Sequence, residues 1–320
     1  MDTYPIEIEI PDIRLYADGT DGIPYVHTFD SGLPGPHVMI NSITHGNEVC
    51  GAIIVKELLD LDIRPERGRL TLAFANVDAF NNFHADTPDD SRFVDQDLNR
   101  VWTTEILDDL SLDSSELRRA RMMRPVIDTI DFLLDLHSMH ERSDPLIIAG
   151  PLDKGVSLGR EMGAPATIIR DAGHSDGRRL RDYGDFGDPD SPKNATLVEC
   201  GQHWEASVLS VARDCTARFL RSSGIIDDAN IPAGWLQSAS GTTRVVSVTD
   251  AVVAESMDFE FAAPYTGLET FEAAGEIIGW SNGKPVKTPY PNCVLVMPSL
   301  RQLMPGVTVV RLGQLEESVT

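Results

Sequence analysis

The sequence predicts an α/β fold with a mostly parallel, mixed sheet that has helices on both faces, followed by a small all-β domain. Strand-like and helix-like segments alternate through the first two thirds of the chain, which is the pattern of a parallel sheet. The strand-like runs are continuously apolar, as in strands that are buried on both faces. From residue 244 onward only short strand-like runs occur, separated by glycine and proline. A chain of 320 residues has room for two domains at roughly 150 residues each. We place the boundary between residues 224 and 225.

The first domain contains the elements of the predicted sheet in a regular order. Helices are indicated where apolar residues recur with helical spacing after a capping residue, at residues 47–61, 114–130 and 205–220. Strands are indicated by short apolar, β-branched runs, at residues 37–44, 69–76, 132–137, 146–149, 166–169 and 195–199. The second domain is predicted to be a barrel or sandwich, built from the runs RVVSVTDAVVA, MDFEFA, EIIGW, NCVLVM and VTVVRL.

Composition limits the classes of partner. The chain has 27 Lys and Arg against 50 Asp and Glu, a formal net charge of −23, so we expect it to bind neither nucleic acid nor anionic membranes. No apolar run reaches the ~20 residues of a membrane-spanning helix, and the first residues lack a basic and then apolar signal segment. We therefore expect a cytoplasmic protein. The four cysteines show no C-x-x-C spacing, which argues against a disulfide framework or a structural zinc knuckle.

Candidate metal ligands follow two of the predicted strands. His45 and Glu48 stand three residues apart at a strand-to-helix turn, and His137 ends a buried strand. The carboxyl ends of strands are where open α/β sheets bind ligands. Zinc accepts imidazole and carboxylate donors, and three such ligands leave a position for water. Asp135 shares a face of its strand with His137, which places it to fix either a nearby ligand or a backbone donor.

Further polar residues suggest a reaction. Glu199 ends an apolar strand, where it is either an ion-pair partner of an arginine or a general base for an activated water. Arg92, Asn99 and Arg100 lie in a polar connection and suit a substrate carboxylate, the alternative being local Asp–Arg pairs.

A second long connection, residues 174–193, is rich in glycine, aspartate and arginine. We interpret it as a mobile active-site loop that offers Arg178, Arg179 and Arg181 to the substrate, rather than as an inert surface segment. His140 is expected at the surface.

Taken together, these motifs resemble the succinylglutamate desuccinylase/aspartoacylase family of zinc carboxypeptidase-like enzymes. The H-G-x-E motif appears as residues 45–48, D-L-N-R as residues 97–100, D-L-H as residues 135–137 and E-x-G as residues 199–201. The resemblance implies one zinc ion per chain, held by His45, Glu48 and His137. It further implies Glu199 as general base, Arg92 as the oxyanion stabiliser, and Asn99 with Arg100 on the substrate carboxylate, under a β domain that covers the site.

The resulting prediction is a zinc-dependent hydrolase that cleaves the amide bond of a small N-acyl amino acid. A zinc carboxypeptidase acting on short peptides and a non-catalytic binding protein on the same scaffold are the alternatives. A thiol hydrolase that uses Cys50 or Cys200 is a third. The oligomeric state stays open, with a homo-oligomer among the options.

Overall fold

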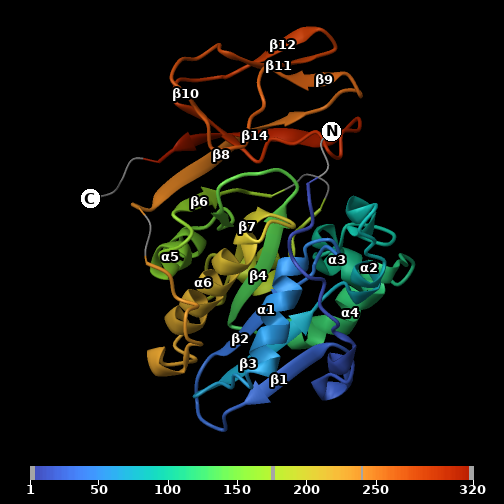
Figure 1. The fold of residues 1–320 in the computed structure, drawn as a ribbon, viewed down its shortest axis with the longest axis vertical. Coiled ribbons are helices and arrows are strands. Elements are labelled where there is room, and N and C mark those ends of the chain that lie inside the picture. The colour runs from blue at the N-terminus through green and yellow to red at the C-terminus, as the bar shows by residue number, and fades with distance from the viewer. Residues whose placement is uncertain (1–3, 174–176, 239–240, 317–320) are drawn as a thin grey trace.

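The computed structural model describes residues 4–173, 177–238 and 241–316. These residues form an eleven-stranded mixed sheet in the order β1-β3-β2-β4-β7-β5-β6-β8-β14-β13-β10, and a three-stranded sheet in the order β12-β11-β9 (Figure 1). The strands of the large sheet are β1 (Val26–Asp30), β2 (His37–Ser42), β3 (Arg69–Phe74), β4 (Phe132–Met139), β5 (Leu146–Ile148), β6 (Thr167–Arg170), β7 (Asn194–Gln202), β8 (Arg244–Val253), β10 (Thr270–Phe271), β13 (Cys293–Val296) and β14 (Thr308–Leu315). The strands of the small sheet are β9 (Phe259–Phe261), β11 (Ile277–Ser281) and β12 (Lys284–Lys287).

The α-helices of the described residues are α1 (Val49–Asp60), α2 (Val77–Asn81), α3 (Thr104–Asp108), α4 (Ser115–Ile127), α5 (Asp153–Met162) and α6 (Ser207–Ser222). They cover both faces of the sheet, because alternate residues of its strands join different cores. Val38 and Ile40 of β2 pack in a core with residues of α1, α5 and α6, whereas Met39 packs in a second core with residues of α4. The predicted α/β class with helices on both faces is therefore confirmed.

Several elements were not predicted. One of them, α5, contains Gly155 and Gly159, which weaken the helical signal of its sequence. Gly155 allows the helix to approach the sheet closely, since a Cβ at this position would lie 1.9 Å from the carbonyl oxygen of Ala149. The edge strand β1, which pairs antiparallel with β3, and the short helices α2 and α3 were also missed.

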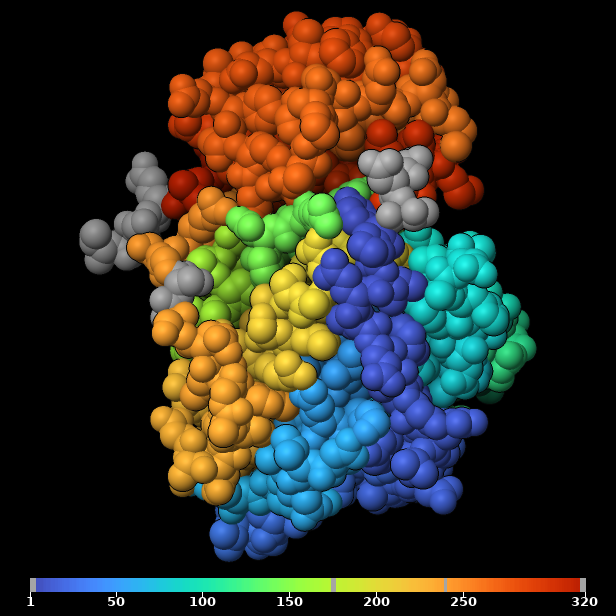
Figure 2. Space-filling view, in the orientation of Figure 1, coloured from blue at the N-terminus to red at the C-terminus, as the bar shows by residue number. Residues whose placement is uncertain are grey.

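The β-rich C-terminal segment continues the main sheet. β8 pairs parallel with β6, and β14 then pairs antiparallel with β8. The small sheet packs on this extension through a shared apolar core that includes Phe259, Ile278 and Leu295. In Figure 2 the segment, coloured orange to red, forms a lobe over the rest of the molecule. The short strands were predicted, but their continuity with the main sheet was not.

The arrangement of three parallel strands positions the candidate site. β2 pairs parallel with β4, and β4 pairs parallel with β7, so the three strands end at the same edge of the sheet. His137 of β4 lies opposite Glu199 of β7 in this register. No helix among the described residues is long and apolar enough to cross a bilayer.

Candidate active site

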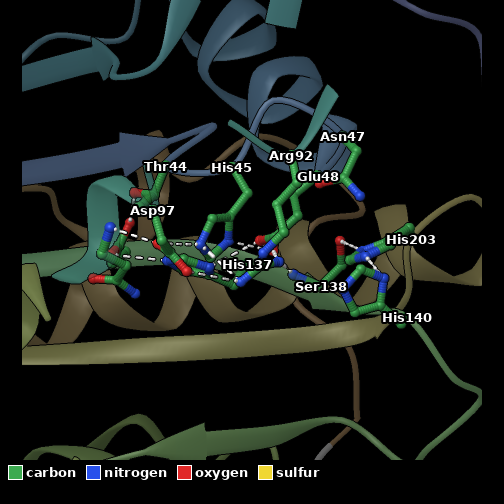
Figure 3. Close-up of polar contacts among 12 residues, drawn as sticks. Thr44, His45, Asn47, Glu48, Arg92, Asp97, His137, Ser138, His140 and His203 are labelled. Carbon is green, nitrogen blue, oxygen red and sulfur yellow. Dashed lines mark hydrogen bonds and ion pairs between the residues drawn. The ribbon is translucent and has the colours of Figure 1, made fainter. Parts of the chain in front are cut away.

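The three predicted metal ligands meet at this sheet edge. One ligand atom from each of His45, Glu48 and His137 lies within 4.8 Å of the others. His45 Nδ1 is 2.6 Å from Glu48 Oε1, and His137 Nδ1 is 2.8 Å from Glu48 Oε2. Both imidazoles thus turn their Nδ1 atoms toward one carboxylate (Figure 3). All three residues are buried.

A second carboxylate lies behind each imidazole. His45 Nε2 is 2.9 Å from Asp97 Oδ1, and His137 Nε2 is 2.9 Å from Asp135 Oδ2. The other oxygen of Asp135 accepts hydrogen bonds from Asn41 and Thr44, which hold it in place. Histidines that bind metals commonly direct their second nitrogen at a carboxylate, because this fixes the ring and strengthens the donor atom. The sequence indicated a supporting position for Asp135 near the ligands, and it gave no sign of Asp97.

The turn between β2 and α1 shapes the cluster. Ile43 takes a left-handed backbone conformation with φ of 46°, which reverses the chain just before His45. Gly46 is required by close packing, because a Cβ there would lie 2.4 Å from backbone atoms of Ala79 and Ser91. The backbone N–H of Ser138 donates to Glu48 Oε2 at 3.1 Å, which links the turn to β4.

The donor set fits a zinc ion. Two imidazoles and one carboxylate are a ligand set of catalytic zinc sites, which keep a fourth position open. Close to these donors, Glu199 Oε2 is buried and makes no hydrogen bond with any described residue. A buried polar oxygen without such a partner is costly, and a cation held by the nearby ligands would compensate it.

Glu199 lies beside this cluster, within β7 and opposite His137. Its carboxyl group is buried, and burial raises its pKa to about 8, with a further contribution from the charge of Glu48. Glu199 lines the same cavity as the three ligands. The group is therefore close to the place where a water would be activated.

Arg92 also lies against the ligands. Its guanidinium lies 2.9 Å from His45 Nε2, 3.4 Å from Glu48 Oε1 and 3.3 Å from Asp97 Oδ2. Its side chain is largely buried and lines the cavity. A positive group is thereby fixed next to the candidate metal position.

Asn99 and Arg100 also line the cavity. The side-chain oxygen of Asn99 accepts a hydrogen bond from the backbone N–H of Leu180 at 2.9 Å, so its amide group keeps N–H donors for another partner. The guanidinium of Arg100 donates to the backbone carbonyl of Asn99 and lies 3.8 Å from Asp97.

The arginine-rich connection differs from the expected mobile loop. Residues 174–176 lie outside the described residues, and the rest forms two short 3-10 helices, Leu180–Asp182 and Gly184–Gly187. Arg179 lines the cavity, but it is buried and paired with Asp171 and Asp182.

The other two arginines of this connection lie elsewhere. Arg181 is buried and donates to Asp182 and to the carbonyl of Ala195, while Arg178 is exposed beside a different hollow. The expected contact of Arg178 and Arg181 with the substrate is not supported, because buried ion pairs and outward orientation direct them away from the cavity.

The cavity itself encloses about 160 Å³. One wall comes from the C-terminal segment, through Met297, Ser299, Gln302, Val307, Thr308 and Arg311. The charges in its lining are mixed, since Arg311 lies 3.5 Å from the carboxylate of Asp171. The resemblance implied that the β domain covers the site, but sequence patterns could not identify the residues of this wall, because they depend on how the C-terminal strands pack.

His140 was expected at the surface, and this was wrong. Its side chain is only 14% exposed and lines the cavity. The chain folds back at the end of β4, which brings His140 against His203 at the end of β7. Figure 3 shows both rings beside Ser138. No motif marked these two histidines.

The cysteines offer no nucleophile. All four are buried and reduced. A hydrogen bond with Cys50, together with burial, holds the pKa of Cys200 well above its ordinary value. A thiol that stays protonated and inaccessible cannot attack a substrate, so the thiol hydrolase alternative loses its basis.

Comparisons with known proteins agree with this geometry. Residues 34–184 match the model of the succinylglutamate desuccinylase/aspartoacylase catalytic domain. The chain is 32% identical over 118 residues to a probable aspartoacylase of Nostoc sp., and 30% identical over 124 residues to a human N-acyl-aromatic-L-amino acid amidohydrolase (carboxylate-forming). These alignments cover 34% and 36% of this chain, and 37% of each relative.

The fold is also that of solved members. The structure of a succinylglutamate desuccinylase/aspartoacylase from Rhodobacter sphaeroides matches with a TM-score of 0.66 at 17% identity, covering 89% of this chain and 87% of that one. The sequence motifs, the domain model that matches residues 34–184 and this shared fold together support the succinylglutamate desuccinylase/aspartoacylase family for this chain.

Proposed function

We propose that this protein is a zinc-dependent hydrolase that releases a carboxylic acid from a small N-acyl amino acid. The observation that carries the proposal is the convergence of His45, Glu48 and His137 at the sheet edge, with Glu199 in the same cavity. The activities of the two relatives, a probable aspartoacylase and an N-acyl-aromatic-L-amino acid amidohydrolase, support the same class of reaction.

Hydrolysis of an amide needs a stronger nucleophile than water and a place for negative charge on the carbonyl oxygen. Zinc in this ligand set would act as a Lewis acid that polarises the carbonyl and acidifies a water. Glu199 takes the proton from the attacking water and delivers it to the departing nitrogen. Burial raises its pKa, which helps the group to hold the proton between the two steps, and the positive charge of a bound metal would favour the ionised form that accepts the proton.

Arg92, Asn99 and Arg100 account for the other interactions that the reaction requires. Arg92 lies against the ligands and stabilises the negative charge that develops on the carbonyl oxygen. Asn99 and Arg100 provide N–H donors on the cavity wall, and these bind the carboxylate of the amino acid.

The size of the cavity favours a small substrate over a peptide. A volume of about 160 Å³ suits an N-acyl amino acid, and the C-terminal segment closes one side. This wall is the part of the structure that argues against the carboxypeptidase alternative. We assign no acyl group, amino acid or oligomeric state.

The test begins with metal content. We expect purified protein to contain about one zinc ion per chain and to release amine from members of a panel of N-acyl amino acids. Removal of the metal with a chelator should abolish this activity, and zinc should restore it. Absence of bound metal in protein refolded with zinc would refute the proposal.

Glu199→Ala then separates the base from the ligands. We expect this variant to keep its zinc and to lose at least about a thousandfold in kcat, because general base catalysis and proton delivery both depend on this carboxyl group. Elemental analysis and amine detection measure the two effects. Loss of zinc from the variant would instead make Glu199 a ligand.

A further inference from the structure

One ring nitrogen of His140 has polar neighbours, and the other has no hydrogen-bond partner among the described residues. Its Nδ1 lies 3.2 Å from Nε2 of His203 and 3.4 Å from Oδ1 of Asp89. Its Nε2, on the opposite edge of the ring, is buried and has no hydrogen-bond partner among the described residues. The ring also lines the cavity that contains the metal-ligand candidates (Figure 3).

The neighbours of Nδ1 determine where the ring carries its hydrogen. The close contact with His140 and the nearby charge of Arg301 lower the pKa of Asp89, so this carboxylate is ionised and can only accept hydrogen bonds. The hydrogen of His140 therefore lies on Nδ1, and Nε2 has the lone pair. The other tautomer would direct a lone pair at the carboxylate and bury an N–H without an acceptor, which is the costlier arrangement.

His203 fits this assignment. It is fully buried, and burial holds its pKa well below the ordinary value, so the ring is neutral and has one hydrogen. With its Nε2 facing the N–H of His140, its own hydrogen lies on Nδ1 and is donated to Ser138 Oγ at 2.8 Å. Ser138 is also the residue whose backbone N–H holds Glu48. The orientation of His140 is thus fixed by groups that adjoin the metal-ligand cluster.

A hydrogen-bond acceptor in this wall complements one part of the proposed substrate. The carbonyl and carboxylate groups of an N-acyl amino acid only accept hydrogen bonds, whereas its amide N–H donates. Arg92, Asn99 and Arg100 provide donors for the accepting groups. Of the acidic residues in the wall, Asp171 is already paired with Arg179 and Arg311.

We propose that His140 is a substrate-binding residue whose Nε2 accepts a hydrogen bond from the scissile amide N–H of the N-acyl amino acid. The inference rests on the proposed function, because it concerns the same cavity and the same substrate class. The contact holds the amide nitrogen in a fixed orientation while the carbonyl is attacked, and it leaves the product amine beside His140 after the bond breaks.

Paired substrates test the contact. An N-acetyl amino acid that the enzyme cleaves is compared with its ester analogue, in which oxygen replaces the amide N–H. We expect His140→Phe to lose about ten- to a hundredfold in kcat/KM on the amide, as for loss of a buried hydrogen bond, and less than about threefold on the ester. His140→Gln, which keeps an acceptor near the position of Nε2, should recover most of the activity on the amide.

Controls separate this contact from a structural role. His84→Phe, at an exposed histidine, should leave both substrates unaffected. Equal losses on amide and ester, no loss on either, or loss of zinc or of thermal stability in both His140 variants would overturn the inference. If the wild-type protein cleaves neither substrate, the proposed function is what fails, and the inference falls with it.

Discussion

Each imidazole of the ligand cluster lies between Glu48 and a second, outer carboxylate. The sequence indicated only one of the two outer carboxylates, that of Asp135. Asp135 could be predicted because residues two apart share a face of a strand. Asp97 could not, because it is 52 residues from His45 and approaches it only through the folding of the connection between β3 and α4. The ligands themselves were predictable because each follows or ends a buried strand.

The outer carboxylate of His45 leads to a prediction for metal binding. Asp97→Asn keeps the shape of the side chain but removes the charge that orients the imidazole and strengthens its donor atom. We expect zinc affinity to fall about ten- to a hundredfold, a usual effect of losing such a group. Competition with a chromophoric chelator measures this. As a control, Asp90→Asn, at an exposed position of the same connection, should keep the wild-type zinc affinity. Unchanged zinc affinity in Asp97→Asn would show that the contact between Asp97 and His45 does not support metal binding.

Among the elements, strands were predictable and connections were not. Continuous apolar runs identify β2, β4 and β7, and the rule that parallel strands end at one edge brings their polar residues together. Residues 177–193 have the composition of a solvated loop, yet Arg179 and Arg181 are buried there. Their charges are compensated by Asp171 and Asp182, which lie within hydrogen-bonding reach only in the folded chain.

The residues after α6 also show that composition alone does not predict which side chains are buried. The predicted boundary at residues 224 and 225 follows a change in composition, but Ile225, Ile226 and Trp235 pack in the core formed with α1, α5 and α6. We therefore propose that residues 225–236 stabilise the first domain even though they lie in the second by sequence.

A pair of tryptophan substitutions tests this role. Trp235→Ala removes a side chain that is 5% exposed, so we expect it to lower the free energy of unfolding by about 3–5 kcal/mol. Trp280→Ala, in β11 and only half-buried, should cost distinctly less. Urea unfolding followed by circular dichroism measures both values. Equal losses in the two variants would show that residues 225–236 contribute no special packing to the core.

At the scale of the whole molecule, one sheet unites the ligand-bearing strands with the C-terminal wall of the cavity. The parallel pairing of β8 with β6 produces this continuity, and it joins residues far apart in the chain. A sequence pattern reports the faces of a strand but not its neighbours, which is why the continuation of the main sheet into the C-terminal segment was not expected. Stability of the sheet and integrity of the site are therefore coupled.

His37 links the stability of this sheet to pH. It begins β2, where its ring lies 2.8 Å from Thr71 Oγ1 and 3.0 Å from Thr129 Oγ1. Burial, with the charge of Arg69, lowers its pKa from 6.5 to about 4, although Asp131 and Asp30 act in the opposite direction. The folded protein thus holds this ring neutral between about pH 4 and 6.5, whereas the unfolded chain binds a proton.

Because the unfolded state binds more protons in that interval, the contribution of His37 to stability is complete above pH 6.5 and is lost as the pH falls toward 4. We expect the drop in unfolding free energy from pH 7 to pH 5 to be smaller by about 1–2 kcal/mol in His37→Asn than in the wild type. Urea titrations at both values, with chelator present so that metal release does not contribute, measure the difference. His84→Asn removes an exposed histidine and should retain the wild-type drop. An equal drop in His37→Asn and the wild type would mean that this ring is protonated without unfolding, and that the interior at the start of β2 admits charge.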